Sequence, residues 1–506
     1  MASTPVDPRF PLRPASEESL LAFREFLREI EFSDHSLCRR LEMDDMSDLG
    51  TVNWEVRSAQ LPGRLRLVVD LFVRGLLVHA GTLQATVGEK IFATLRETGL
   101  IEDSRINVGS VYCPVWLYPA DGFVVASDRR NDPEGGSFET PEDVVFPGIY
   151  GGTLRFLRML PDAAGSDALD LCGGSGIGAF HLARTAKSAA TSDLTPRAAR
   201  FAEFNARLNG LAVESLCGDL YQPLNGRQFD VITAHPPFVP STGKTLVYRD
   251  AGETGEDVTR GIITGLADHL RPGGCCMITC IACDTRDQTF EQRVKDWLGA
   301  AREEFDVIFG LEKVMPVDEV LDSIRKRGQH VSADQVAAMR ERLQAAGTRQ
   351  FVYGTIWLER LRPVRPLSPI RVRITPAATA ADFHRLRMFR RERARPDFFP
   401  RLAAARPAYS SQSQLTVRHV PKDGLLVPVE FMFTSEGPLN AAFRPDGWVV
   451  PLLARLNGSV SVSEVFRAAA DSGELPEGFP EQVFLELIAT VVEQGLLEAD
   501  LGASPA

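Results

Sequence analysis

The sequence predicts an α/β protein built on a mostly parallel sheet. From about residue 150, short apolar runs alternate with helical patterns, which is typical of parallel strands joined by helices. A glycine-rich turn follows the first of these runs and a proline-rich turn follows the fourth. At 506 residues the chain is too long for one core, so further domains are expected on either side of this region.

The central domain is expected to span 148–362 and to hold seven strands. They are predicted at 168–172, 188–193, 213–217, 229–234, 275–281, 305–309 and 351–359. Helical patterns fill most of the gaps, and a polar helical insertion over about 316–346 precedes the last strand.

Residues 1–147 predict an α+β domain. Apolar residues at helical spacing predict an amphipathic helix over 16–32 and another over about 88–98, which Gly99 ends. Two extended runs follow, 108–117 and 123–127. Helices followed by a β-pair fit a winged-helix-like module, and they equally fit a plain α+β cap on the next domain.

The C-terminal part divides by composition. Residues 363–440 are rich in arginine and proline and predict a linker, and 441–506 predict a small, mainly helical domain. The stretch 360–401 alone holds twelve arginines and three acids, although the whole chain carries a net charge of −11. This stretch can bind phosphates of a nucleic acid. Alternatively, it can be a solvated linker whose arginines pair with acidic residues of the rest of the chain.

The overall composition is that of a soluble globular protein, with 44% hydrophobic and 24% charged residues. No apolar run is long enough to predict a membrane span, and the N-terminus lacks a secretory pattern. Four of the eight cysteines lie within 275–283, where they fit a buried strand better than a metal site. We therefore expect a cytoplasmic protein without a metal.

The glycine-rich turn, from Asp170 to Gly176, predicts a site for an adenosine-type cofactor. Its glycines let the backbone turn sharply and approach a ligand, although a purely structural turn would look alike. Asp193 at the next strand end can take both ribose hydroxyls, and Asp219 after the third strand can reach an adenine. The predicted cofactor-binding residues are Asp170, Cys172, Gly174, Gly176, Asp193, Asp219 and His235.

The proline-rich turn, His235-Pro236-Pro237-Phe238, predicts a site for the target group. Its two prolines fix the backbone and remove two N–H donors, so carbonyl oxygens stay free to accept. The Phe238 ring can stack on a planar group. Such a turn suits an amino group on a planar system, and an ordinary rigid turn is the plain alternative.

Residues 148–283 resemble a class I S-adenosylmethionine-dependent methyltransferase, in the group of the release-factor glutamine methyltransferases and small-domain RNA methyltransferases. The family's Asp-Leu-Cys-Thr-Gly-Ser-Gly turn appears here as 170–176, and its Asn-Pro-Pro-Tyr/Phe turn as 235–238. Segments 248–250, 255–257 and 270–274 match as well. The resemblance implies a Rossmann-like sheet, S-adenosylmethionine as the cofactor, and methyl transfer by in-line displacement. The whole layout is similar to a group of bacterial methyltransferases.

Within that resemblance, His235 replaces the family's asparagine. In the family, the asparagine oxygen and the first proline carbonyl accept the two N–H hydrogens of the target amine. A neutral imidazole can still accept one hydrogen bond, and it can instead act as a base near neutral pH. The predicted catalytic residues are His235, Pro236, Pro237 and Phe238, and the predicted substrate-binding residues are Phe238, Tyr248, Arg249 and Asp250.

The predicted activity is N-methylation of a planar or amine-bearing group, on a protein side chain or a specialised small molecule. Two alternatives stay open at this point. One is an RNA base methyltransferase that binds its RNA through the basic stretch and the N-terminal module. The other is a protein that binds S-adenosylmethionine without catalysis. A homodimer is compatible with the sequence.

Overall fold

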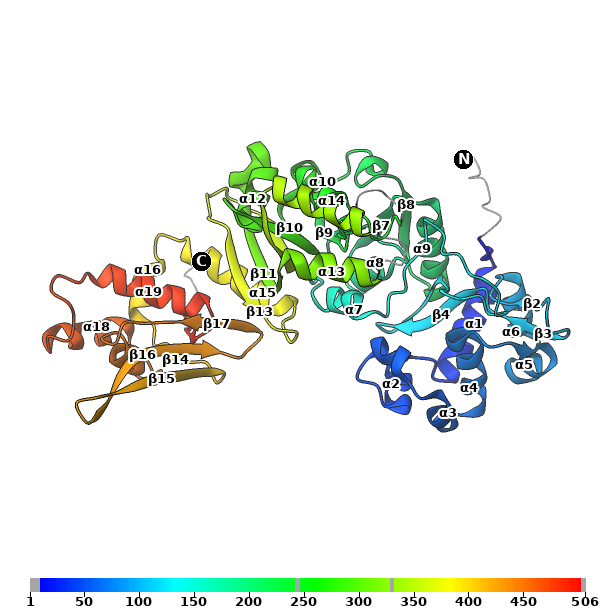
Figure 1. The fold of residues 1–506 in the computed structure, drawn as a ribbon, viewed down its shortest axis with the longest axis horizontal. Coiled ribbons are helices and arrows are strands. Elements are labelled where there is room, and N and C mark those ends of the chain that lie inside the picture. Colours follow the sequence, from blue (N-terminus) through cyan, green and yellow to red (C-terminus); the bar gives the residue numbers. More distant parts are fainter. Residues whose placement is uncertain (1–9, 242–245, 328–331, 502–506) are drawn as a thin grey trace. The chain divides into compact units, whose positions relative to one another are not determined.

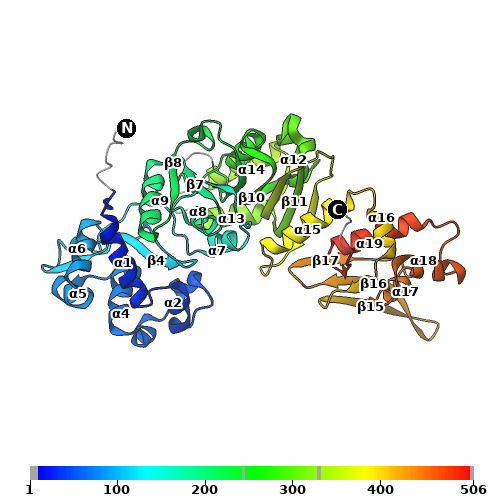
Figure 2. The ribbon, with the colours of Figure 1, turned by 180° about the vertical axis from the view of Figure 1, so that it is seen from behind.

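The computed structural model describes residues 10–241, 246–327 and 332–501, and it divides into two compact units (Figure 1). Unit 1 comprises Met1–Val307 and Lys313–Pro369, and unit 2 comprises Ile308–Glu312 and Ile370–Ala506. Figure 2 presents the same ribbon from behind. No helix in the described ranges is both long and apolar enough to cross a membrane.

Unit 1 begins with a mainly helical segment. Its elements are α1 (Glu17–Glu29), α2 (Asp34–Leu41), η1 (Met46–Thr51), α3 (Trp54–Arg57), η2 (Ser58–Gln60), α4 (Gly63–Val69), η3 (Asp70–Arg74), β1 (Val78–His79), α5 (Ala80–Val87), α6 (Glu89–Glu97), β2 (Glu102–Asp103) and β3 (Ser110–Tyr112). Helix α1 confirms the predicted amphipathic helix, because the apolar residues of one face, Leu20, Phe23, Phe26 and Leu27, are buried and Ser16 caps its first turn. Helix α6 ends, as predicted, before Gly99, which has a φ of 73°.

The predicted extended run 108–117 is divided in the structure. Strand β3 pairs with β1 and β2 in a small sheet of order β1-β3-β2, whereas β4 (Val115–Ala120) pairs with β5 (Phe123–Asp128) in a separate hairpin. Pro114 lies at the break, where its missing N–H cannot continue a ladder. The elements α4, β1, α5, α6, β2 and β3 follow one another in the order expected of a winged helix. The winged-helix interpretation stays a proposal.

The β4–β5 hairpin is fastened to a helix of the central region, α9 (Pro196–Asn209). The Asn205 side chain accepts from the N–H of Ala126 at 2.8 Å and donates to its carbonyl at 2.9 Å. Arg197 forms a buried ion pair with Asp128. Because these groups are buried, they fix where the N-terminal segment meets the central sheet.

The central sheet of unit 1 is mostly parallel, as predicted. Its strands follow the order β12-β10-β9-β6-β7-β8. Neighbours from β10 to β8 are parallel, and β12 is antiparallel to β10. The strands are β6 (Asp167–Leu171), β7 (Ser188–Asp193), β8 (Val213–Cys217), β9 (Phe229–Ala234), β10 (Leu270–Thr285) and β12 (Thr348–Arg360). The seventh predicted strand is β11 (Phe305–Met315), whose middle, 308–312, counts with unit 2.

Helices separate these strands in sequence, as the alternation predicted. They are α7 (Gly151–Arg158), α8 (Ile177–Leu182), α9, α10 (Asp257–Thr264), α11 (Leu266–His269), α12 (Phe290–Trp297), α13 (Val317–Arg327) and α14 (Ala333–Ala345), with short turns η4 (Gln222–Leu224) and η5 (Gly299–Glu304). The pair α13 and α14 is the predicted polar insertion. The four clustered cysteines lie in β10 and are buried and free, as the buried-strand interpretation predicted.

Unit 2 differs from the prediction over 363–440, where a linker was expected. That range contains β13 (Ile370–Ile374), α15 (Ala380–Arg393), α16 (Phe398–Ala404), β14 (Ala408–Tyr409), β15 (Ser413–Lys422), β16 (Leu425–Ser435) and the start of β17 (Leu439–Phe443). After it come α17 (Val450–Ala454), α18 (Val462–Asp471), α19 (Glu481–Glu493) and β18 (Leu497–Glu498). One apolar core joins α16, α17, α18 and α19, so the described residues 370–501 fold together.

The arginines of this unit explain the difference. Arg390 and Arg393 of α15 both form ion pairs with Glu493 of α19, at 3.0 and 2.5 Å. Arg401 pairs with Glu392 at 2.6 Å. The local composition does not reveal a partner about a hundred residues away. Helix α15 is packed, but its arginine-rich composition is the same as that of a solvated linker. The pairing favours the structural interpretation of these arginines over phosphate binding.

Candidate active site

The glycine-rich turn joins β6 to α8 through a backbone that only small residues permit. Cys172, Gly174 and Gly176 have φ of 57°, 54° and 88°, in the left-handed region that favours glycine. A side chain at Gly173 would collide with Thr191 of β7, whereas nothing lies within 4 Å of the Cβ position of Gly174. The turn therefore packs closely on the sheet and leaves the backbone at Gly174 accessible.

Asp170 lies beneath this turn. Its buried carboxyl accepts a hydrogen bond from the Thr233 hydroxyl at 2.8 Å, and a side chain at Gly178 would collide with it. Burial raises the pKa of Asp170 to about 7, although bonds from Thr233 and the Ala179 N–H lower it. This placement lets Asp170 support the turn from below.

Asp193 holds the turn from the neighbouring strand. One carboxyl oxygen accepts from the Gly174 N–H at 3.0 Å, and the other accepts from the Thr195 N–H at 3.1 Å. Burial raises the pKa of Asp193 above its usual value, and the hydrogen bonds from Thr195 and Gly174 oppose the rise. Asp193 is thus fixed at the strand end where the sequence predicted a ribose contact.

The thiol of Cys172 is buried near three carboxyl groups. Burial is the largest cause that raises its pKa, and the charges of Asp193, Asp170 and Asp219 add to the rise. Asp219 itself is exposed, just beyond β8. The ionised forms of these carboxyl groups suit a ligand with a positive centre, such as a sulfonium. The predicted cofactor residues therefore lie together, and they fit this class of ligand.

The target turn begins beside the cofactor turn. In the parallel pairing of β6 and β9, Leu171 lies opposite Ala234. The next residue after each strand is Cys172 for β6 and His235 for β9, so the two turns start from adjacent strands. Neighbouring strands in such a sheet lie about 4.8 Å apart. In parallel sheets ligands bind at the carboxyl ends of strands, and these two turns occupy that edge.

The His235 ring is enclosed by α7. It stacks on Phe156 with centroids 5.3 Å apart and an angle of 17° between the rings, and a Cβ at Gly152 would lie 3.7 Å from it. Phe238 lies on another side at 5.8 Å. Burial lowers the pKa of His235 to about 4, and neither ring nitrogen bonds to any residue of the described ranges. The imidazole is neutral near pH 7, which favours the acceptor role over the base.

The loop after the target turn is held by its own residues. Val239 donates to the Arg249 carbonyl at 2.9 Å, and Ala251 donates to the Val239 carbonyl at 3.1 Å. The buried Asp250 carboxyl accepts from the Arg249 guanidinium at 2.8 Å and from the Leu246 N–H at 3.1 Å. Of the predicted substrate residues, Arg249 and Asp250 therefore fasten the loop, while Tyr248 stacks on Phe146 at 4.9 Å.

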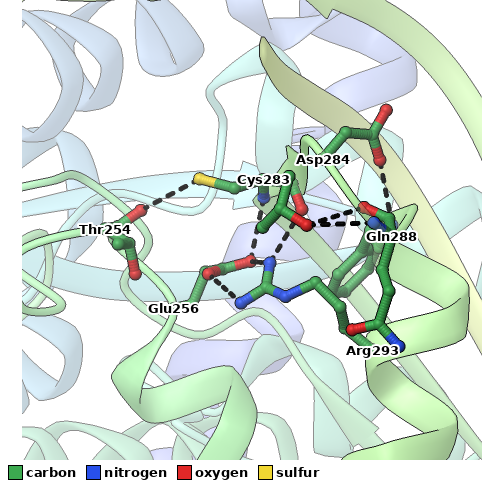
Figure 3. Close-up of polar contacts among 8 residues, drawn as sticks. Thr254, Glu256, Cys283, Asp284, Gln288 and Arg293 are labelled. Atoms are coloured by element: carbon green, nitrogen blue, oxygen red, sulfur yellow. Dashed lines mark hydrogen bonds and ion pairs between the residues drawn. The ribbon is translucent and has the colours of Figure 1, made fainter. Parts of the chain in front are cut away.

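A buried ion pair that the sequence analysis missed supports the same loop (Figure 3). Glu256 receives two hydrogen bonds from Arg293 of α12, at 2.8 and 2.9 Å, and one from the Cys283 N–H at 2.8 Å. Arg293 also donates to the Cys283 carbonyl. The adjacent Gly255 approaches the Phe238 carbonyl so closely that a side chain would collide with it. The pair thereby joins the end of β10 to the target turn.

Comparison with known proteins assigns this region to a family. Residues 148–306 match the family model described as methyltransferase small domain. This part of the chain is a class I methyltransferase domain of the group that contains the release-factor glutamine methyltransferases, and its cofactor is S-adenosylmethionine.

Curated relatives resemble the same region. A putative protein N5-glutamine methyltransferase of Methanocaldococcus jannaschii is 28% identical over 133 residues, 25% of this chain and 67% of the relative. A release factor glutamine methyltransferase of Gloeobacter violaceus is 31% identical, over 28% of this chain and 57% of the relative. A ribosomal protein uL3 glutamine methyltransferase of Bradyrhizobium diazoefficiens is 31% identical, over 28% and 51%. The chain thus spans about half to two thirds of these relatives.

The solved structures that resemble the chain are less similar to it. A putative methyltransferase from Streptococcus mutans is 15% identical, over 55% of this chain and 66% of that one, with a TM-score of 0.27. A 16S rRNA methyltransferase of T. Thermophilus, in complex with AdoMet and guanosine, is 17% identical, over 43% and 57%, with a TM-score of 0.26.

Replacing Asp193 with asparagine tests the cofactor side. We expect S-adenosylhomocysteine to bind at least about tenfold more weakly, because a carboxylate is lost where the ribose is expected. In the unchanged protein, affinity falls as pH drops through the raised pKa of Asp193, since the protonated carboxyl is no longer a pure acceptor. Calorimetric titration across pH measures both effects. Equal affinities at neutral pH would remove Asp193 from the cofactor site.

Replacing Glu256 with glutamine tests the support of the target turn. The change leaves the Arg293 charge buried without its counter-ion, so we expect unfolding to become easier by about 3 kcal/mol. The matched control is Glu319→Gln, which breaks the exposed pair with Lys313 and should cost less than about 1 kcal/mol. Urea unfolding followed by tryptophan fluorescence measures both, and equal losses would contradict the assignment.

Proposed function

We propose that the protein transfers the methyl group of S-adenosylmethionine to a nitrogen of a planar group on a protein side chain. The observation that carries the proposal is the pairing of Leu171 with Ala234, from which the cofactor turn and the target turn start side by side. The names of the curated relatives, which methylate glutamine in proteins, support a protein acceptor.

The target turn supplies acceptors for the N–H hydrogens of such a nitrogen. His235, neutral because of its lowered pKa, presents one lone pair, and the Pro236 carbonyl presents another. Phe238 offers a face on which the planar group stacks. With both hydrogens held, the nitrogen lone pair is aimed at the cofactor side, and positioning of this kind supplies up to about 7–11 kcal/mol in ideal cases.

The bound cofactor supplies an electrophilic methyl group on a sulfonium. The acceptor nitrogen forms the new N–CH₃ bond as the S–CH₃ bond breaks, and one N–H proton leaves to water. A base is not required before transfer, because a planar nitrogen held by two acceptors is already oriented. This is consistent with a histidine of low pKa at position 235.

Methyl transfer into a fractionated cell extract tests the proposal. The purified protein is supplied with radiolabelled S-adenosylmethionine, and the products are sorted into protein, RNA and small molecules. We expect the label in protein, because the names of the curated relatives give a protein acceptor and because Arg390, Arg393 and Arg401 of the basic stretch pair with Glu493 and Glu392. Label in RNA or in small molecules would contradict the protein acceptor. Cofactor binding without label in any fraction would favour the non-catalytic alternative.

Replacing His235 tests its role. His235→Asn keeps an acceptor at this position, so we expect kcat/KM within about tenfold of the original and the same profile from pH 6 to 8. The His235 pKa of about 4 means that the ring gains a proton, and loses its acceptor role, only below that range. His235→Ala should lose on the order of a hundredfold. A break near pH 6.5 that disappears in His235→Asn would show that the histidine acts as a base.

A further inference from the structure

The segment 146–152 runs between the two turns of the site. A Cβ at Gly148 would lie 3.3 Å from Ile177, the first residue of the helix that follows the cofactor turn. A Cβ at Gly152 would lie 3.7 Å from the His235 ring. The Gly148 N–H donates to the buried hydroxyl of Tyr118 at 2.6 Å, which fixes the segment in place. Its aromatic residues are therefore held beside the site.

Three aromatic rings form a stack on this segment. The ring centroids of Phe146 and Tyr150 lie 4.6 Å apart, and Tyr248 stacks on Phe146 at 4.9 Å with an angle of 20° between the rings. Tyr248 comes from the loop after the target turn, and the Val247 N–H of that loop donates to the Glu142 carbonyl at 3.0 Å. The rings are half-buried, so they keep faces and edges that a ligand can reach.

Arg130 covers this stack with a charge that no acid of the described ranges neutralises. Its guanidinium lies 4.6 Å from the centroids of both Phe146 and Tyr150, and the side chain is exposed. By contrast, the ring-stacked Arg64 and Arg96 each also pair with a carboxylate. A guanidinium that lies over aromatic rings and has no carboxylate partner in the described ranges has N–H groups available, and these match a carboxylate with two parallel hydrogen bonds.

We propose that Arg130, held over Phe146 and Tyr150 and completed by Tyr248, forms a subsite that binds a carboxylate carried by the methyl acceptor. The inference rests on the proposed function, since it takes the target turn as the place of the acceptor nitrogen. It adds a specificity: acceptors with an acidic group near the methylated nitrogen are preferred over neutral ones. With a protein acceptor, the carboxylate belongs to an acidic side chain next to the methylated residue, and a preference confined to a small planar acid would contradict that source.

Binding of matched fluorinated probes tests this subsite without methyl transfer. The full-length protein, saturated with S-adenosylhomocysteine, is titrated into two probe pairs followed by ¹⁹F NMR relaxation. The small pair is 4-fluorobenzoate and 4-fluorobenzamide. The peptide pair is trifluoroacetyl-glutamyl-glutamine amide and trifluoroacetyl-glutaminyl-glutamine amide. We expect the acid of at least one pair to bind about tenfold or more tightly than its neutral partner, and that pair identifies the source of the carboxylate.

Arg130→Gln should abolish the preference for the acid, and Arg64→Gln, which removes a ring-stacked arginine outside the site, should leave it unchanged. The proposal is overturned if neither acid is preferred, or if the preference survives in Arg130→Gln. Either result leaves the methyl-transfer test untouched, and a failure of methyl transfer would not remove a carboxylate preference that depends on Arg130. The two proposals therefore fail separately.

Discussion

A buried side-chain hydrogen bond, from the Thr233 hydroxyl to the Asp170 carboxyl, connects the two paired strands whose ends form the site. These residues lie opposite each other in the parallel pairing of β6 and β9. A slip of one residue would turn every side chain of one strand to the other face and would bury the Thr233 hydroxyl and the Asp170 carboxyl without each other. The bond therefore selects the register that brings the glycine turn beside the target turn.

With this register the two turns have different electrostatic surroundings. The cofactor side gathers the carboxyls of Asp170, Asp193 and Asp219 around Cys172, so its field favours a positive centre. The target side is enclosed by aromatic rings, and burial there keeps the His235 imidazole neutral. Arg130 is the nearby positive charge without a counter-ion in the described ranges. The site thus separates three clustered carboxyl groups, a neutral imidazole and a guanidinium that has no counter-ion in the described ranges.

Individual elements show how local patterns succeed or fail as predictors. Helices α1 and α6 and the seven strands were predictable because each carries its own period, and the two helices also carry end signals, the Ser16 cap of α1 and Gly99 after α6. The short strands β1 and β2 were not, since two residues give no period. The linker prediction over 363–440 was wrong because Glu493, the partner of Arg390 and Arg393, lies a hundred positions away.

The sequence by itself determined the α/β class, the parallel strands, and the residues of both turns, because glycines, prolines and periodicity act locally. Only the tertiary structure decided what the neighbours do to those residues. It enclosed His235 against Phe156 and lowered its pKa, paired Arg249 with Asp250, and joined Glu256 to Arg293. Burial and ion pairing depend on which distant side chains meet, and that information resides in the packed fold rather than in any local stretch of the chain.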